Sequence, residues 1–201
     1  MADEHFLIIP NRHIAHTLEL DNPQEEEYLQ LKQDLIDYLL LDKQLDYLLF
    51  ERNVPFKFEK AAHMNVQIVG MPSSSSLEDR VRKLLKTFEV QFGSKFEEIV
   101  DREQDLRTSL GNDPTKHFFY LEVPGMKTAR GRQRLRFYTV IGEGSRFDMQ
   151  FGRVLACHLM NERDKINWKN SILERPREEE LAKKFQKEIE ARARANSVKT
   201  E

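Results

Sequence analysis

Three polar side chains at every second position of one short stretch are the strongest candidates for chemistry. Residues 61–72 read AAHMNVQIVGMP, and apolar residues separate His63, Asn65 and Gln67. This alternation predicts a β-strand with one polar face and one apolar face. The imidazole could act as a nucleophile or carry a proton, whereas the two amides can only donate and accept hydrogen bonds. The simpler interpretation is that the three residues form the solvent-exposed side of a half-buried strand.

The apolar spacing predicts the elements that position this strand. Residues 6–9 form a continuous apolar run ending at Pro10, which predicts a strand buried on both faces. A helix is expected from Asp21 to about Asp42, and a second strand over residues 47–50. After the polar strand, the four serines at 73–76 predict a hinge or a flexible linker, followed by an amphipathic helix.

The second half of the chain alternates aromatic strands with charged segments. Residues 117–125 predict a strand that ends in a Pro-Gly turn, and residues 135–144 predict its antiparallel partner. The connection between them is the most basic piece of the chain, and its cations have no acidic neighbour in the sequence. We therefore expect a basic loop there. Helices are expected within residues 147–161 and over residues 178–195.

Composition excludes several classes of protein. The chain has 201 residues, a formal net charge of −2 and a single cysteine, Cys157. One cysteine cannot form an internal disulfide, and no apolar run approaches the ~18 residues that would span a membrane. The sequence has no glycine-rich phosphate loop and no paired-histidine metal motif. We therefore expect no cofactor, no metal site and no membrane partner.

Several sequence blocks resemble one protein family. The polar strand HMNVQIVGMP is similar to the histidine-triad (HIT) signature His-x-His-x-His, with two of the three histidines replaced. Together with HFLIIPNRH, FERN, FFYLEV, MQFGRVLA and LAKKFQKE, it resembles the paired C-terminal domains of CwfJ-type (Cwf19-like) splicing factors. The similarity is to the branch associated with the lariat debranching enzyme, and it covers nearly all of residues 6–188.

The resemblance implies an α+β fold in two parts. Residues 1–76 would form a HIT-like antiparallel sheet with helices, and residues 77–201 a small α+β second domain with a connecting helix and a C-terminal helix. Because only four residues precede His5, the HIT-like part is expected to be truncated at its N-terminus. Residues of the degenerate triad face and its surroundings would line the nucleotide pocket, namely His5, His13, His63, Asn65 and Gln67.

The resemblance also implies a nuclear role on late spliceosomes and excised intron lariats. In active HIT enzymes the middle histidine carries the covalent intermediate, so Asn65 predicts that this chain is not an enzyme. We expect a non-catalytic RNA-binding and docking module of a factor for pre-mRNA splicing and intron-lariat turnover. Its partners would be intron-lariat or branched RNA, the lariat debranching enzyme and spliceosomal proteins.

Cations and rings of the second half are the expected RNA contacts, because cations pair with phosphates and rings stack on unpaired bases. These residues are Lys116, Lys127, Arg130, Arg132, Arg134, Arg136 and Arg153, with Phe119 and Tyr138. The simpler interpretation is a solvated basic surface with its rings in the core. Two other functions stay open, a HIT-type nucleotide hydrolase or transferase with residual activity and a protein–protein adaptor acting through the charged C-terminal helix.

Overall fold

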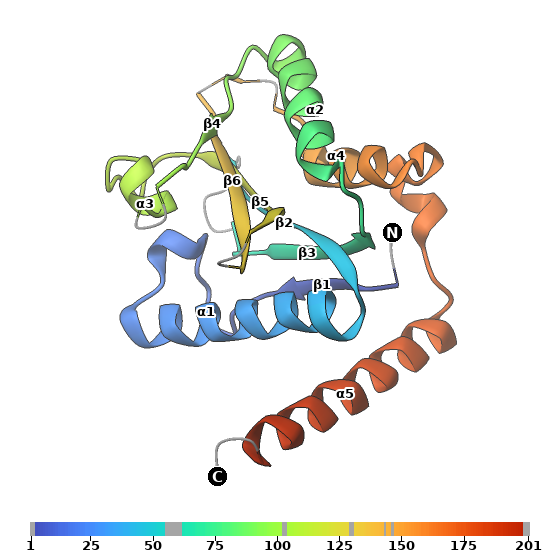
Figure 1. The fold of residues 1–201 in the computed structure, drawn as a ribbon. Helices are drawn as coiled ribbons and strands as arrows, with labels where there is room; N and C mark the ends of the chain where they lie inside the picture. Colours follow the sequence, from blue (N-terminus) through green and yellow to red (C-terminus); the bar gives the residue numbers. More distant parts are fainter. Residues whose placement is uncertain are drawn as a thin grey trace.

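The computed structural model describes residues 3–54, 62–101, 104–128, 131–142, 144–145 and 147–198, and it confirms the α+β class. The strands described form one antiparallel sheet in the order β1-β3-β2-β5-β6-β4 (Figure 1). They are β1 (His5–Ile8), β2 (Leu45–Asn53), β3 (Val66–Pro72), β4 (Glu97–Glu98), β5 (Phe118–Thr128) and β6 (Gly131–Val140). Strands from both predicted parts of the chain therefore join in a single sheet. The HIT-like assignment and the boundary after Ser76 stay predictions.

Helical segments surround this sheet. They are η1 (Thr17–Glu19), α1 (Asn22–Asp37), η2 (Tyr38–Asp42), α2 (Leu77–Phe92), α3 (Leu106–Ser109), α4 (Phe151–Met160), η4 (Arg163–Ile166), η5 (Trp168–Ser171) and α5 (Arg175–Val198). As predicted, α1 begins after Asp21. The Asp21 carboxylate accepts the backbone N–H of Gln24, and the Gln24 side chain accepts the backbone N–H of Asp21. The π-helical turn η2 then carries the chain to Asp42, where the sequence places the helix end.

The sheet separates two hydrophobic cores. One face packs against α2 and α4 through residues that include Phe50 and Phe119. The opposite face packs against α1 through residues that include Tyr47 and Leu49. Consecutive residues of β2 thus belong to different cores, as expected for a central strand buried on both faces. Figure 1 shows α2 and α4 on one side of the sheet and α1 on the other, and the two faces are called the α4 face and the α1 face below.

β1 is an edge strand, which corrects the expectation that both of its faces are buried. Among the described strands it pairs only with β3, and Leu7 is 49% exposed. Phe6, on the other side of the strand, packs against Phe185 of α5 with ring centroids 4.6 Å apart. The apolar run at 6–9 is therefore explained in part by docking of the C-terminal helix, which the local sequence pattern could not reveal.

The serines at 73–76 are held in place, which corrects the expectation of a hinge. The Ser73 hydroxyl and the Ser74 backbone N–H donate to the two carboxylate oxygens of Asp46, at 3.2 and 3.0 Å. Asp46 is fully buried in β2. Ser76 directly precedes α2, so this segment connects β3 to α2 through fixed contacts.

Pro124 and Gly125 lie inside β5 and do not end it. The strand continues to Thr128 past a register shift between Pro124 and Lys127, and β6 begins at Gly131. Most of the predicted basic loop is therefore the paired end of a β-hairpin. β5 and β6 are antiparallel neighbours, as the sequence predicts.

The C-terminal helix α5 is attached to the body by a few specific contacts. The Glu188 carboxylate accepts hydrogen bonds from Lys43 Nζ, at 2.7 Å, and from the Tyr38 hydroxyl. Further along, Arg192 Nη1 lies 2.5 Å from the Asp42 carboxylate. The helix crosses below α1 and ends away from the sheet (Figure 1).

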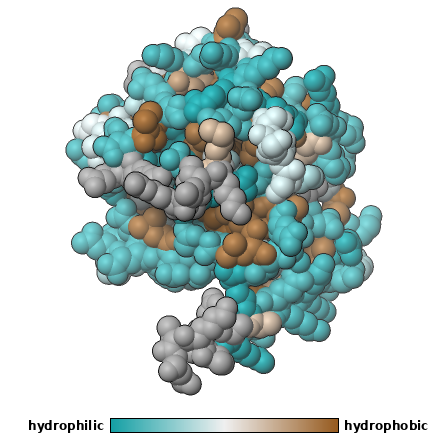
Figure 2. Space-filling model, in the orientation of Figure 1, coloured by the Kyte–Doolittle hydropathy of each residue, from teal (hydrophilic) through white to brown (hydrophobic). Residues whose placement is uncertain are grey.

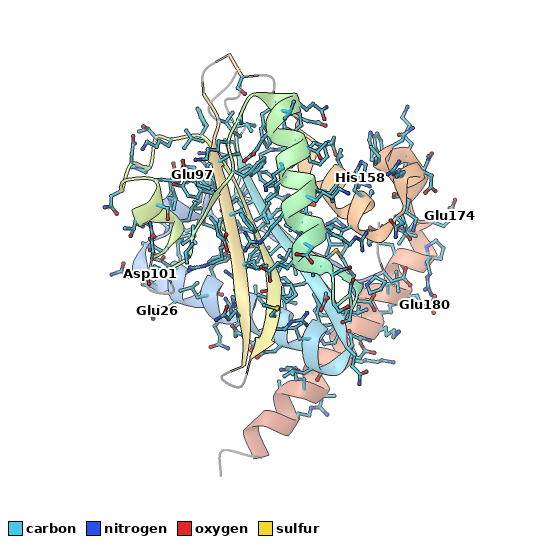
Figure 3. All side chains as sticks on the ribbon, turned by 45° about the horizontal axis from the view of Figure 1, so that its top comes forward. Glu26, Glu97, Asp101, His158, Glu174 and Glu180 are labelled. Carbon is cyan, nitrogen blue, oxygen red and sulfur yellow. The ribbon has the colours of Figure 1, made fainter. Side chains whose placement is uncertain are left out.

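The outer surface is polar and charged. Glu26, Glu174 and Glu180 are exposed and point outward (Figure 3). Figure 2 shows hydrophilic residues over most of the face in view, with separate hydrophobic patches between them. Within the described parts of the chain, no helix has the length and apolar character needed to cross a membrane.

Candidate functional site

The predicted polar strand begins only at Val66, so His63 and Asn65 precede β3, but the predicted alternation of burial extends over them. The apolar residues between its polar positions are buried, namely Met64, Val66 and Ile68. His63 is exposed, whereas Asn65 and Gln67 are half-buried. Gln67 pairs in register with Phe50, whose ring belongs to the core of the α4 face. The triad-like residues therefore lie on the α4 face, beside the second half of the chain.

Two pairwise contacts join the predicted histidines to this strand. His5 Nε2 lies 3.1 Å from Gln67 Oε1. Burial lowers the pKa of His5 to about 4, and this hydrogen bond opposes the effect, so the ring is neutral at physiological pH. His63 Nε2 donates to the carbonyl of Pro10 at 3.1 Å, and its ring meets the His13 ring edge-on with centroids 5.2 Å apart. The residues predicted for the triad face thus gather in one region, but His5 and His13 are not among the residues that line the cavity there.

A cavity of 260 Å³ opens between this strand, β2 and the start of α4. We call it the triad pocket. Its polar lining comes from three segments of the chain, with His63, Asn65 and Gln67 around β3, Arg52 and Asn53 on β2, and Gln150 and Arg153 at α4. Arg153 was predicted from the second half of the sequence, and the fold places it beside residues predicted from the first half.

Gly152 allows α4 to approach β2 this closely. A Cβ atom at this position would clash with the ring of Phe50. The first turn of α4 therefore borders the cavity. The positive end of a helix dipole and its free backbone N–H groups favour a nearby anion. This close approach gives a physical reason for the glycine in the QFGR block.

The triad pocket has an electropositive lining. None of its described lining residues is acidic. Its two guanidinium groups are held by neutral partners, since Arg52 donates to the carbonyl of Met149 and Arg153 Nη1 lies 3.3 Å from both the Lys165 carbonyl and Ser171 Oγ. Neither guanidinium forms an ion pair with a described carboxylate, although the charge of nearby Asp148 acts on Arg52 and partly opposes the lowering of its pKa by burial. Such a cavity suits an anionic ligand better than a cationic one.

Two residues that line the triad pocket each carry a buried polar atom with no hydrogen-bond partner among the described residues. Asn65 Oδ1 is an acceptor, and Arg52 Nε is a donor. Buried polar atoms are nearly always paired, and leaving one unpaired costs about 1–3 kcal/mol. Asn65 and Arg52 therefore bring unused hydrogen-bonding capacity to the border of the pocket.

The basic stretch has acidic partners, which corrects the expectation that its cations have none. Arg132 Nη1 lies 2.7 Å from the Asp46 carboxylate, and Arg134 Nη1 lies 3.4 Å from the Glu122 carboxylate. Both carboxylates are fully buried. Neither acid belongs to the basic stretch itself, so a local reading of charge could not find these pairs.

Two of the remaining predicted RNA contacts, Arg136 and Lys116, form hydrogen bonds within the protein. Arg136 donates to the carbonyls of Gln104, at 2.8 Å, and of Asp101. Lys116 Nζ donates to the carbonyl of Leu110 at 2.7 Å. Both cations therefore pair with backbone carbonyls. Lys127 lies in β5, where only its backbone pairing is described, and Arg130 lies outside the described residues.

The two predicted stacking rings are occupied within the protein. Phe119 is 1% exposed and packs among the rings of the α4-face core, which corrects its assignment as a ring available for a base. Tyr138 is half-buried, and its hydroxyl donates to Glu97 at 2.8 Å. Because aromatic residues serve cores as well as RNA surfaces, composition alone cannot separate the two uses.

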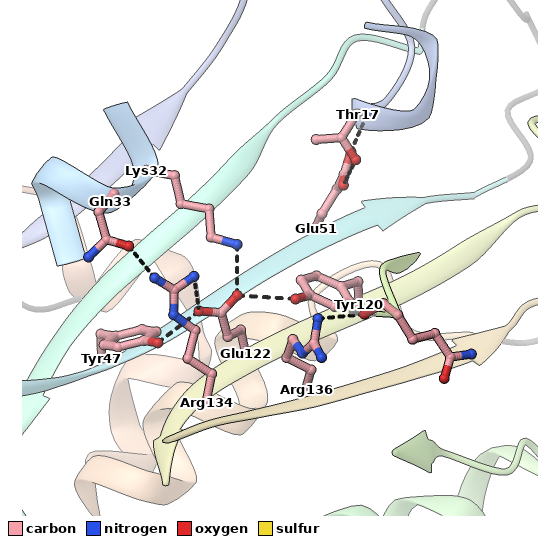
Figure 4. A network of polar contacts seen from close by, with 10 residues as sticks. Thr17, Lys32, Gln33, Tyr47, Glu51, Tyr120, Glu122, Arg134 and Arg136 are labelled. Carbon is pink, nitrogen blue, oxygen red and sulfur yellow. Dashed lines mark hydrogen bonds and ion pairs between the residues drawn. The ribbon is translucent and has the colours of Figure 1, made fainter. Parts of the chain in front are cut away.

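Sequence reasoning missed a buried polar network on the α1 face (Figure 4). Glu122 is fully buried and accepts from Lys32 Nζ at 2.7 Å, from the Tyr47 hydroxyl at 2.8 Å and from the Tyr120 hydroxyl at 3.1 Å. Burial alone would raise the pKa of Glu122, but the charges of Lys32 and Arg134 outweigh burial and hold the pKa below its ordinary value. The network ties α1 to the centre of the sheet.

Glu51 is a second buried carboxylate on the same face (Figure 4). It accepts the Thr17 backbone N–H at 2.8 Å and the Thr17 hydroxyl at 2.6 Å. Burial raises the pKa of Glu51 to about 7, although both hydrogen bonds lower it. The signal in the sequence was a glutamate within an otherwise apolar strand, in LLFERN and again in FFYLEV.

Comparisons with known proteins now test the sequence resemblance. Residues 1–83 match the family model described as "Protein similar to CwfJ C-terminal". The chain is 26% identical over 198 residues to Zinc finger CCCH domain-containing protein 64 of Arabidopsis thaliana, covering 94% of this chain and 30% of that protein. It is also 26% identical over 192 residues to CWF19-like protein 1 of Homo sapiens, covering 94% of this chain and 32% of that protein.

Both relatives are much longer than this chain. It spans roughly a third of the length of the two relatives above. The family model covers the strands that build the triad face, and the relatives extend the similarity through α4 and into α5. These matches confirm that the chain is similar to the C-terminal region of CwfJ/Cwf19-type proteins, whereas the HIT-like assignment and the branch associated with the debranching enzyme stay predictions.

Proposed function

We propose that this chain is a non-catalytic RNA-binding and docking module, and that its triad pocket holds one nucleotide of the RNA. The observation that carries the proposal is the composition of that pocket. It combines two arginines that form no ion pair with a described carboxylate, the start of a helix and a set of amides, and no described lining residue is acidic. This is the combination that a nucleotide needs, because its phosphate is anionic and its base and sugar form hydrogen bonds.

Different residues of the pocket would contact different parts of the nucleotide. Arg52 and Arg153 would pair with the phosphate, next to the first turn of α4. Asn65 and Gln67 would contact the base or the sugar, since amides can both donate and accept. A volume of 260 Å³ lies just below the range of about 300–1,000 Å³ typical of ligand pockets, so the pocket would hold at most one nucleotide. The RNA would therefore have to be unpaired at this point.

The same geometry supports binding without turnover. Asn65 stands where the resemblance places the nucleophile, and an amide has no nucleophilic ring nitrogen. His5 is neutral and contacts Gln67, while His63 contacts the Pro10 carbonyl. We therefore expect no hydrolysis of dinucleotides or nucleoside phosphoramidates. Turnover that is lost on His63→Ala would contradict this expectation and favour a residual HIT-type hydrolase.

The cellular role follows from the family and is part of the proposal. We propose that the chain acts in the nucleus, in pre-mRNA splicing and intron-lariat turnover, with the late spliceosome and the lariat debranching enzyme. The support is the relationship to CwfJ/Cwf19-type proteins. Photocrosslinking of the protein to a branched RNA and to its linear counterpart would test the RNA class. Co-purification with the debranching enzyme, with and without ribonuclease, would separate protein docking from shared RNA.

A single substitution tests the pocket itself. Arg153→Gln removes the charge and keeps a donor for the Lys165 carbonyl, so we expect the fold to persist and binding of 5′-AMP and RNA to weaken about tenfold or more. Arg80→Gln is the matched control. Arg80 also donates to backbone carbonyls of α4, those of His158 and Leu159, but lies outside the pocket. Equal affinities of the two variants and the unaltered protein would refute nucleotide binding at this site.

A further inference from the structure

A second, larger cavity lies on the α1 face of the sheet. It has a volume of 530 Å³ and runs between α1 and the segment around residues 100–107, with the first half of β6 closing one side. We call it the α1 groove. Its walls carry arginines of β6 and α3, Tyr28 of α1, and exposed apolar residues that include Leu29 and Val100. Because the triad pocket lies on the α4 face, the two cavities are on opposite sides of one sheet.

We infer that the α1 groove is a second RNA site, which binds an unpaired strand through Arg136 of β6 and Arg107 of α3, with the exposed part of Arg134, and through stacking on Tyr28. This inference rests on the proposed RNA-binding function and adds a separate surface to it. The α1 groove brings together cations in a row, a half-buried ring and an apolar rim. Proteins that bind single strands without strict sequence preference use this same combination.

The spacing of the arginines suits neighbouring phosphates of one nucleic-acid strand. Arg134 and Arg136 are two residues apart on one face of β6, and two residues of a strand advance about 6.8 Å. This distance is comparable to the separation of successive phosphates in both paired and unpaired strands, so the spacing does not itself select a single strand. The preference for a single strand rests on Tyr28, because a ring can stack only on bases that are unstacked from their neighbours.

Two of the groove arginines are available for phosphates. Arg136 is held by backbone carbonyls, and Arg107 forms no ion pair with any described residue. Arg134 keeps part of its guanidinium outside its ion pair with Glu122, since its side chain is 38% exposed. The arginines thus belong to two groups, those needed to neutralise buried acids and those free to bind.

The carboxylates of the groove are engaged with protein donors. Glu122 accepts from Lys32, Tyr47 and Tyr120, and Glu51 accepts twice from Thr17. A third, the carboxylate of Asp105, caps α3 through the Thr108 backbone N–H at 2.7 Å. Only Glu25 remains at the rim without such a contact among those described. The groove therefore presents guanidinium and phenol groups to a ligand more than carboxylates.

The test uses substitutions that do not expose a buried acid. Arg107→Ala combined with Arg136→Ala removes two groove cations, whereas changing Arg134 would leave Glu122 short of a partner. The control removes two charges elsewhere, by Arg175→Ala combined with Arg194→Ala on α5, whose side chains are 89% and 82% exposed. Binding of a fluorescent single-stranded 12-mer and of its duplex would be followed by anisotropy over a range of salt.

We expect the groove variant to bind the single strand at least tenfold more weakly and to lower the salt slope of log K by about 1.4, since each phosphate contributes about 0.7. The control variant should keep the slope. Tyr28→Ala should weaken binding about tenfold with the slope nearly unchanged, because stacking releases no counterions. The unaltered protein should prefer the single strand to the duplex.

The outcomes separate this inference from the proposed function. If the unaltered protein binds no RNA, the proposed function fails. If Arg153→Gln weakens RNA binding and the groove variant does not, the triad pocket stands and the groove inference is overturned. Poly-glutamate serves as an acidic peptide probe. If the groove variant loses binding to poly-glutamate but keeps its RNA binding, the groove inference is also overturned and the groove is assigned to a protein partner.

Discussion

The buried carboxyl of Glu51 allows a sharp test through pH. Glu51→Gln removes the charge while keeping the shape, and the amide can accept the Thr17 N–H and donate to the Thr17 hydroxyl. Burial raises the pKa of Glu51 from 4.5 to about 7. Each unit by which the pKa of a group differs between the folded and unfolded states corresponds to about 1.4 kcal/mol of stability. Ionisation of Glu51 should therefore destabilise the folded state by about 3 kcal/mol.

The sign of the pH dependence follows from the raised pKa. Below pH 4.5 the carboxyl is protonated in both states, and its contribution to stability is fully present. As the pH rises through 7, the unfolded chain ionises more readily than the folded one, and that contribution is lost. The glutamine is neutral throughout. We therefore expect the variant to be similar to the unaltered protein at pH 4.5 and about 3 kcal/mol more stable than it at pH 8.5.

Urea unfolding of both proteins at several pH values would measure this difference in the free energy of unfolding. The pH dependence of all other groups is the same in both proteins and cancels in the difference. Glu27→Gln, on the exposed side of α1, is the control and should show no such trend. A difference between Glu51→Gln and the unaltered protein that does not change between pH 4.5 and 8.5 would refute the reasoning, because Glu51 would then titrate alike in both states.

Three further substitutions probe the packing that supports the two cavities. Lys32→Met leaves the buried Glu122 short of its nearest cation and should cost about 3–5 kcal/mol in urea unfolding at neutral pH, with a smaller loss in acid, where the carboxyl protonates. Gly152→Ala should cost about 1–3 kcal/mol through its clash with Phe50, and adding Phe50→Leu should restore part of the loss. If the stability losses of the two single variants simply add in the double variant, this contact is not the cause. Phe185→Ala should cost about 2 kcal/mol and raise amide hydrogen exchange along α5 first, and uniform exchange instead would show that α5 is not a separate unit.

Local patterns in the sequence were enough to find most elements. Alternation marks β3 and the hairpin strands, and the capping residues at Asp21 mark the start of α1. The alternation also placed His63, Asn65 and Gln67 together, because these residues follow one another along an extended segment that leads into β3 at Val66. These features depend on neighbours in sequence, whose periodicity is set by backbone geometry. Recognition of the family added the link to the QFGR block, which the fold places beside the triad face.

What the sequence could not show depends on long-range contacts. The acidic partners of Arg132 and Arg134 lie in other strands, so the basic stretch looked free of acids. Phe119 looked like a stacking ring because burial is decided by α4, which is distant in the chain. Arg52 was not singled out because one arginine in a strand is unremarkable until its guanidinium is seen to border the triad pocket.

The partners of the arginines give a rule for choosing which of them bind RNA. A guanidinium that neutralises a buried carboxylate cannot leave it without a large cost, so Arg132 and Arg134 serve the fold first. A guanidinium held by a carbonyl gives up only a hydrogen bond when it turns to a phosphate, and gains a charge pair. By this rule Arg52 and Arg153 on one face, and Arg136 on the other, are the cations to change first. Density of basic residues in the sequence instead favours Arg132 and Arg134, which the fold uses to neutralise buried acids.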